Sequence, residues 1–135
     1  MPSTFYLEVV TPERIFFGGN AQMVIVPGID GSQGILPHHE AMVTTIGIGE
    51  LKIKINNQWR TAAIANGFME VMPDYVIILA DSVEWPEEID VKRAEAAKER
   101  ARERLRQKQS RIEHLRTQAA VRRALTRLKV TKEIK

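Results

Sequence analysis

Four arginines in the last third of the chain are spaced for anion binding. Arg93 and Arg100 lie seven residues apart, and Arg123 and Arg127 lie four apart, so each pair occupies one face of a helix. If the segment folds back on itself near residue 109, the four guanidinium groups converge. Like charges held so close repel one another unless an anion lies between them, and the planar guanidinium fork matches phosphate oxygens. In that arrangement the arginines would form a site for a phosphate-bearing ligand.

These arginines have a second interpretation, in which they extend into solvent and pair with carboxylates of the same segment. The acidic partners would be Glu95, Glu99 and Glu103. Surface pairs of this kind contribute little free energy and bind nothing. Spacing alone leaves both interpretations open, and of the two we favour this second one before any family resemblance is considered.

Conventional catalytic motifs are missing from the sequence. It has no glycine-rich phosphate loop, no dinucleotide fingerprint and no serine framed as a nucleophile. His38 and His39 are adjacent on an expected loop, and His114 is far away, so the three histidines form a poor metal set. We expect a structural or contact role for the loop histidines and a chain that is not an enzyme.

The net charge of +3 conceals a division of the chain into an acidic and a basic part. Residues 1–86 carry four basic and nine acidic groups, whereas residues 87–135 carry sixteen basic and eight acidic groups. Such asymmetry indicates either a contact with a polyanion or an acidic protein surface, or a solvated helix face. No aromatic residue follows Trp85, so base stacking is not available and we do not expect nucleic-acid binding.

Glycine and proline divide the chain at the same place. All eight glycines and six prolines fall within residues 1–86, among short β-type runs. About eight to ten strands in two packed sheets are expected, as a β-sandwich or flattened barrel. The runs are 4–10, 15–17, 21–26, 42–46, 51–55, 59–65, 68–71 and 75–80.

The remaining part, 87–135, is predicted to be two helices of about 18 residues each. Asp90 is a plausible N-cap for the first helix, and Ser110 with Glu113 has the spacing of a capping box for the second. A narrow apolar stripe of the first helix comprises Ala94, Ala97, Ala101 and Leu105. A stripe of the second comprises Ile112, Leu115, Ala119, Val121, Ala124, Leu125 and Leu128.

The turn between these helices, near residues 107–109, contains no glycine and is compatible with helix. Alanine contacts bury little area, so the antiparallel hairpin is expected to be weakly packed. A small free-energy difference would then separate it from one long extended helix, and a ligand that binds one form would shift the population.

Several features of the sequence indicate where in the cell the protein is expected. No stretch approaches the roughly 18 apolar residues of a membrane span, and the N-terminus lacks the pattern of a signal peptide. With no cysteine, the chain has neither disulfides nor thiolate metal ligands. We expect a soluble intracellular protein with a sandwich domain over 1–86 and a helical domain over 87–135.

Four ordered motifs resemble one family, the epsilon subunit of the rotary F-type ATP synthase. They are Leu7-Glu8-Val9-Val10-Thr11-Pro12, Gly34-Ile35-Leu36-Pro37-His38-His39, Gly67-Phe68-Met69-Glu70-Val71-Met72-Pro73 and Ile89-Asp90-Val91-Lys92-Arg93-Ala94. The resemblance covers nearly the whole chain. It implies a non-catalytic subunit of the central stalk that is peripheral to the cytoplasmic face of a bacterial membrane.

The resemblance also implies partners and a regulatory mechanism. The sandwich would bind the gamma subunit and rest on the ring of c subunits. The compact hairpin would permit ATP hydrolysis, and an extended form would reach into the catalytic alpha/beta hexamer and suppress it. The alternative, of a different class, is a free-standing nucleotide-sensing or nucleic-acid-binding module.

In bacillus-type members of this family the compact hairpin binds ATP as a regulatory ligand. The matching residues here are Glu84, Asp90, Arg93, Ala94, Arg100, Arg123 and Arg127. The resemblance assigns the arginines to the phosphates and the Glu84 to Ala94 stretch to the base and ribose. It leaves open whether magnesium accompanies the nucleotide.

Three positions depart from the family pattern. Lys92 stands where a small apolar residue is common, which affects the expected affinity for ATP. Ser32 replaces an acid, and His38 replaces a glycine, in the loop that would meet the c-ring. The loop from Gly31 to Glu40 is therefore assigned to the ring contact only as a region.

Overall fold

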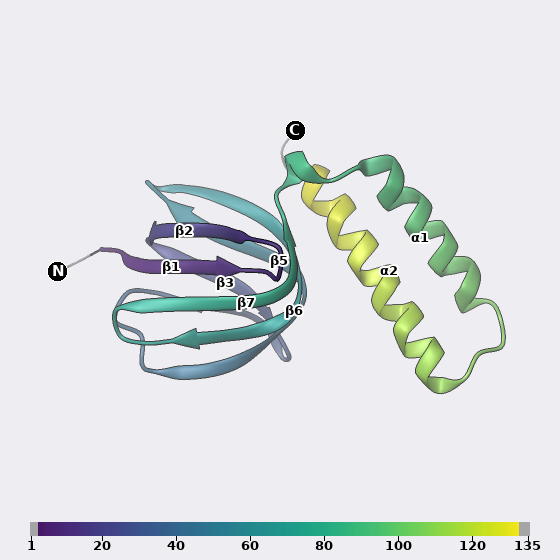
Figure 1. The fold of residues 1–135 in the computed structure, drawn as a ribbon, viewed down its shortest axis with the longest axis horizontal. Coiled ribbons are helices and arrows are strands. Elements are labelled where there is room, and N and C mark those ends of the chain that lie inside the picture. Colours follow the sequence, from purple (N-terminus) through teal and green to yellow (C-terminus); the bar gives the residue numbers. More distant parts are fainter. Residues whose placement is uncertain (1–2, 133–135) are drawn as a thin grey trace.

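The computed structural model describes residues 3–132, as a β domain followed by two helices (Figure 1). The last residues of the predicted helical part, 133–135, lie outside the described residues. The strands are β1 (Phe5–Val10), β2 (Ile15–Ala21), β3 (Met23–Gly28), β4 (Gly31–Ile35), β5 (Met42–Ile55), β6 (Gln58–Val71) and β7 (Tyr75–Glu84). A 3-10 turn, η1 (Pro86–Glu88), leads to the helices α1 (Val91–Leu105) and α2 (Arg111–Lys132).

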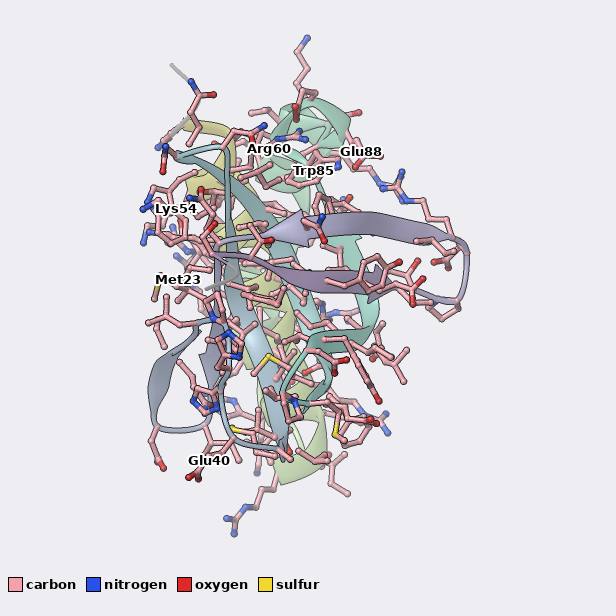
Figure 2. All side chains as sticks on the ribbon, turned by 90° about the vertical axis from the view of Figure 1, so that its left-hand side faces the viewer. Met23, Glu40, Lys54, Arg60, Trp85 and Glu88 are labelled. Atoms are coloured by element: carbon pink, nitrogen blue, oxygen red, sulfur yellow. The ribbon has the colours of Figure 1, made fainter. Side chains whose placement is uncertain are left out.

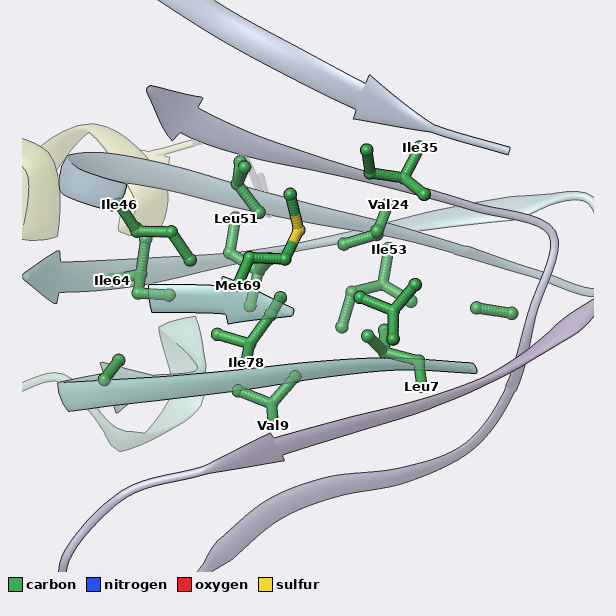
Figure 3. Packing of buried hydrophobic residues seen from close by; sticks show 14 of the residues in the cluster. Leu7, Val9, Val24, Ile35, Ile46, Leu51, Ile53, Ile64, Met69 and Ile78 are labelled. Atoms are coloured by element: carbon green, nitrogen blue, oxygen red, sulfur yellow. The ribbon is translucent and has the colours of Figure 1, made fainter. Parts of the chain in front are cut away.

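The seven strands form one continuous sheet in the order β2-β1-β7-β6-β5-β3-β4. Neighbouring strands are antiparallel except β1 and β7, which are parallel. All seven contribute to one buried cluster, so the sheet curves around a single core (Figures 1 and 3). The most deeply buried members include Leu7, Val24, Ile53, Met69 and Ile78. The expected sandwich architecture is confirmed.

The expected count of eight to ten strands is wrong, because two predicted breaks do not end a strand. β5 continues through Gly47, and β6 continues through Asn66-Gly67. Pairing between β5 and β6 stops at this point and resumes in the same register, with Ile46 opposite Gly67 and Ile48 opposite Ala65. The strands therefore bend without inserting a residue, and Asn66 takes a left-handed φ of 53°. Because of this bend, residues on either side of it in β5 and β6 contribute to the same core.

One strand was missed in the sequence. β4 (Gly31–Ile35) contains two glycines, a serine and a glutamine, none of which favours β-structure. Its ladder with β3 supplies the hydrogen bonds that hold it extended, and Ile35 at its end is fully buried. Pairing and one core residue override its weak local preference.

The two helices form the expected antiparallel hairpin, although they have 15 and 22 residues rather than about 18 each. Asp90 is the N-cap of α1, where its Oδ1 accepts a hydrogen bond from the Arg93 N–H at 3.1 Å. The Ser110 Oγ accepts one from the Glu113 N–H at 3.2 Å at the start of α2. Both predicted helix starts are confirmed.

Side chains rather than glycine close the turn between the helices. The Gln109 amide nitrogen donates to the Arg104 carbonyl, and its Oε1 accepts from the Thr117 hydroxyl at 3.0 Å. Gln109 thus joins the end of α1 to the second turn of α2. This turn is held by polar contacts that water can replace.

The predicted apolar stripes are confirmed only in part. Ala94 and Ala101 of α1 and Ala124 and Leu128 of α2 are buried. In contrast, Ile112, Leu115 and Leu125 are 64%, 56% and 41% exposed. Figure 1 shows the reason for Ile112 and Leu115: only the C-terminal part of α2 lies against the sandwich, and its N-terminal part projects away beside α1. The hairpin is therefore sparsely packed.

Candidate functional site

An open, cationic cavity of about 690 Å³ lies between α1 and α2 of the hairpin. Four arginines line it, Arg100 and Arg104 from α1 and Arg116 and Arg123 from α2. Among residues 3–132, Glu113 is the one acidic residue of its lining. Alanine contacts along the helices and the polar residues of the turn complete the walls. Four guanidinium groups facing one carboxylate make an environment that favours an anion.

The helix geometry explains how these arginines meet. Arg100 and Arg104 are separated by four residues and Arg116 and Arg123 by seven, so each pair projects from one helical face. The short side chains of Ala97, Ala101 and Ala120 line the same cavity, which leaves room between the helices. The narrow alanine stripe thus creates the space in which the arginines lie.

A second, much smaller cleft lies between α2 and the sandwich. It is lined by Glu84 and Ser82 of β7 and by Arg123, Thr126 and Arg127 of α2, among others. Here the Arg127 Nε donates to the Glu84 Oε1 at 2.6 Å. Because Arg123 lines both the cleft and the hairpin cavity, it connects them.

The predicted site residues are brought together only in part. Arg100 and Arg123 share the cavity, and Glu84, Arg123 and Arg127 share the cleft. Asp90 and Arg93 are linked at the start of α1, and Ala94 is buried there. Arg93 lines neither of these two spaces, so the expected convergence of all four guanidinium groups at one place is not seen.

The alternative pairing scheme also differs from the structure. Glu95 and Glu99 pair with Lys98, at 3.0 and 3.7 Å, and Glu103 pairs with Arg106. Within residues 3–132, no carboxylate lies within 4.0 Å of a side-chain nitrogen of Arg93, Arg100 or Arg123. These three guanidinium groups are available to a ligand.

Sequence reasoning missed Arg104 and Arg116, which line the cavity beside Gln107 and Gln109. A signal was present, since Arg104 lies one turn beyond Arg100 and Arg116 lies two turns before Arg123. The histidines stay outside these spaces, and His38 and His39 lie in the expected loop between β4 and β5. Among the described residues, no group of three or more His, Cys, Asp or Glu side chains is placed to hold a metal ion.

Two models of known families match consecutive parts of the chain. The ATP synthase delta/epsilon chain beta-sandwich domain matches residues 4–86, and the delta/epsilon long alpha-helix domain matches residues 87–132. The chain belongs to the ATP synthase delta/epsilon chain family. This membership confirms the resemblance found in the motifs. It also makes the chain a non-catalytic subunit of a larger enzyme.

Two relatives in this family are similar along almost their entire length. The ATP synthase epsilon chain of Caldicellulosiruptor saccharolyticus is 54% identical over 129 residues, which cover 96% of this chain and 94% of the relative. That of Caldanaerobacter subterraneus subsp. tengcongensis is 51% identical over 131 residues, covering 96% and 95%.

Solved structures share the fold at low identity. A chain in the cryo-EM structure of the Euglena gracilis mitochondrial ATP synthase, OSCP/F1/c-ring, aligns with a TM-score of 0.81 at 19% identity, over 99% of this chain and 82% of that one. A chain of the Tetrahymena thermophila mitochondrial ATP synthase central stalk and c-ring aligns with a TM-score of 0.54 at 14% identity, covering 96% and 95%. In this chain, no described helix is both long and apolar enough to cross a bilayer.

An ion pair beside the hairpin gives a pH-dependent prediction. Hydrogen bonding to Arg14 lowers the pKa of Glu88 below its ordinary value, with the Trp85 N–H as a further donor. A lowered folded-state pKa stabilises the fold above the unfolded value of about 4.5, and this contribution is lost as pH falls through the folded value. Glu88→Gln is therefore expected to lower the free energy of unfolding more near neutral pH than at an acidic pH below the unfolded value. Urea unfolding at both pH values measures this, and a difference that does not change with pH would contradict it.

Proposed function

We propose that this chain is the regulatory and coupling subunit of the central stalk of a bacterial F-type ATP synthase. The sandwich binds the gamma subunit and contacts the c-ring, which couples proton flow to ATP synthesis. In the complex the chain is peripheral to the cytoplasmic face of the membrane. Family membership and the near full-length similarity to named epsilon chains support this role.

The helices regulate hydrolysis by changing between two forms. The compact hairpin permits ATP hydrolysis, and an extended form enters the alpha/beta hexamer and suppresses it. The sparse packing supports this proposal: alanines line α1, Ile112 and Leu115 are exposed, and polar contacts close the turn. Each of these contacts is weak enough to exchange for others.

ATP is the ligand that stabilises the compact form, and the arginine-lined cavity is the observation that carries this proposal. Arg100 and Arg123 bind the phosphates, together with Arg104 and Arg116. The stretch from Glu84 to Ala94 holds the base and ribose, with Arg93 and Asp90 at the start of α1. Arg127, which Glu84 now engages at 2.6 Å, changes partner when a phosphate approaches.

The loop from Gly31 to Glu40 is proposed as the region that meets the c-ring. Ser32 cannot supply the carboxylate that the family pattern has there. His38 takes a left-handed φ of 64°, a conformation that favours glycine, the residue usual at this position in the family pattern. The backbone at His38 thus has a conformation that glycine also adopts readily, although the side chains of the loop differ.

Calorimetric titration of the full chain with ATP, with and without magnesium, tests the nucleotide site. The proposal predicts saturable heat of binding in at least one of the two conditions, and no heat in either would contradict it. Co-purification with the gamma subunit separates the stalk role from a free-standing nucleotide-sensing or nucleic-acid-binding module, since such a module would not retain gamma.

A further inference from the structure

The start of the link between the two domains is fastened to the sandwich by an aromatic cluster. The Trp85 ring stacks on Phe16 of β2, with ring centroids 4.4 Å apart and an interplanar angle of 29°. The Arg60 guanidinium of β6 lies over the Trp85 ring, 3.7 Å from its centroid. Arg60, Trp85 and Glu88 lie together at one end of the sandwich (Figure 2). Aromatic stacking and cation–π contact both favour this arrangement.

Ion pairs hold the 3-10 turn η1 against the same end of the sandwich. The Arg14 Nη2 lies 2.8 Å from one oxygen of Glu88 and 2.7 Å from the other. The Trp85 N–H donates to the Glu88 carboxylate at 2.9 Å, and Pro86 is buried. Arg60 also reaches Glu87 at 3.4 Å. Residues 85–88 are thus held by both β2 and β6 and by the loop before β2.

The next two residues, Ile89 and Asp90, have an extended backbone and connect η1 to α1. Their ψ angles are 126° and 104°. The Asp90 side chain caps α1 and so belongs to the helix. α1 packs along α2, while α2 carries the contacts to β5, β6 and η1. Rotation about Ile89 and Asp90 would separate α2 from η1, but it would leave in place the contacts that Trp85 and Glu88 make to Phe16, Arg60 and Arg14.

We infer that the hairpin pivots at Ile89–Asp90 and that residues 85–88 remain on the sandwich as a fixed anchor. This rests on the proposed function, because it assumes that the hairpin leaves the sandwich. The moving unit then begins at Ile89, three residues beyond the end of the predicted sandwich domain. The anchor fixes the point and direction from which α1 extends.

Two ion pairs give a way to force the movement without ATP. Arg127 pairs with Glu84, and Lys129 pairs with Glu50 at 3.4 Å, so both join α2 to the sandwich. The Glu50 side chain is only 16% exposed. Arg127→Glu with Lys129→Glu places like charges together at both points and favours release of α2. Arg122→Glu with Lys132→Glu makes the same charge change at exposed positions of α2 and is the matched control.

Spin-label distances in the full chain then locate the pivot. The chain has no cysteine, so labels are added in pairs, at Thr45→Cys on the sandwich with either Glu87→Cys on η1 or Lys92→Cys on α1. Glu87→Cys removes the 3.4 Å contact to Arg60 but leaves the Arg14–Glu88 pair and the Trp85 contacts of the anchor in place. In the charge-reversed chain, the 45–92 distance distribution is expected to shift or broaden while the 45–87 distribution stays that of the control. Adding Arg14→Ala is expected to broaden the 45–87 distribution, because it releases the anchor.

Two outcomes overturn the inference. One is a 45–87 distribution that shifts together with 45–92, which would place the pivot before η1. The other is an unchanged 45–92 distribution, which would show that releasing the docking pairs causes no movement at Ile89–Asp90. No nucleotide or partner subunit enters this measurement, so its result is independent of whether the ATP site is correct.

Discussion

Arg123→Ala is expected to weaken ATP binding by about tenfold or more. Of the residues that the structure describes, Arg123 is the one that lines both the hairpin cavity and the cleft beside Glu84 and Arg127. Its replacement removes a charge-assisted hydrogen-bond donor to phosphate, a contact worth about 1.5–3 kcal/mol, and each 1.4 kcal/mol is tenfold in affinity.

Arg122→Ala is the matched control for this prediction. It removes the same charge from the adjacent position, but Arg122 is exposed and lines neither space. Calorimetric titration of both variants and of wild type provides the comparison. Equal losses in the two variants would mean that only net charge matters, and no loss in Arg123→Ala would remove this residue from the site.

Gly67→Ala is expected to destabilise the sandwich by about 3 kcal/mol or more, because the position has no space for a side chain. A β-carbon there would lie 1.9 Å from the Leu79 carbonyl oxygen and 2.8 Å from the Ala80 Cα. These are backbone atoms of β7, the neighbour of β6, so relief requires the two strands to separate at their bend. Against a typical total stability of 5–15 kcal/mol, this loss is large.

Gly19→Ala is the control, since a β-carbon there meets the Phe17 ring at an ordinary 3.6 Å. Thermal unfolding should show a fall in Tm on the order of 10 °C for Gly67→Ala and a much smaller change for Gly19→Ala. A Gly67→Ala chain as stable as wild type would show that β6 and β7 are not held together as described.

The sequence predicted the starts of both helices correctly, because a single capping residue determines each of them. Asp90 and Ser110 cap helices because their side chains satisfy nearby N–H groups, and no distant contact is needed. The β domain shows the limit of such reasoning. Asn66-Gly67 has the composition of a turn, but ladders on both sides hold the strand together through it. The continuity of β6 is therefore determined by its pairing with β5 and β7 and cannot be predicted from the dipeptide alone.

The candidate site shows the same limit. Helical spacing correctly placed Arg100 and Arg123 on facing surfaces, but it also placed Arg93 with them. Which residues meet across a hairpin depends on the lengths of the helices and the geometry of their crossing. Those properties arise from the alanine contacts and the Gln109 bridge, which spacing alone does not contain. Spacing places Arg104 on the face of Arg100 and Arg116 on the face of Arg123, but only the folded chain shows that all four line one cavity.

The most direct test of the account is ATP hydrolysis by the assembled ATP synthase when this chain ends after Glu88. That end point keeps Trp85 and its contacts, so the sandwich retains its anchor while both helices are absent. The account predicts that the truncated chain still co-purifies with gamma and that hydrolysis is several-fold faster than with the full chain. Unchanged hydrolysis in a complex that retains the truncated chain would contradict a regulatory role for the hairpin.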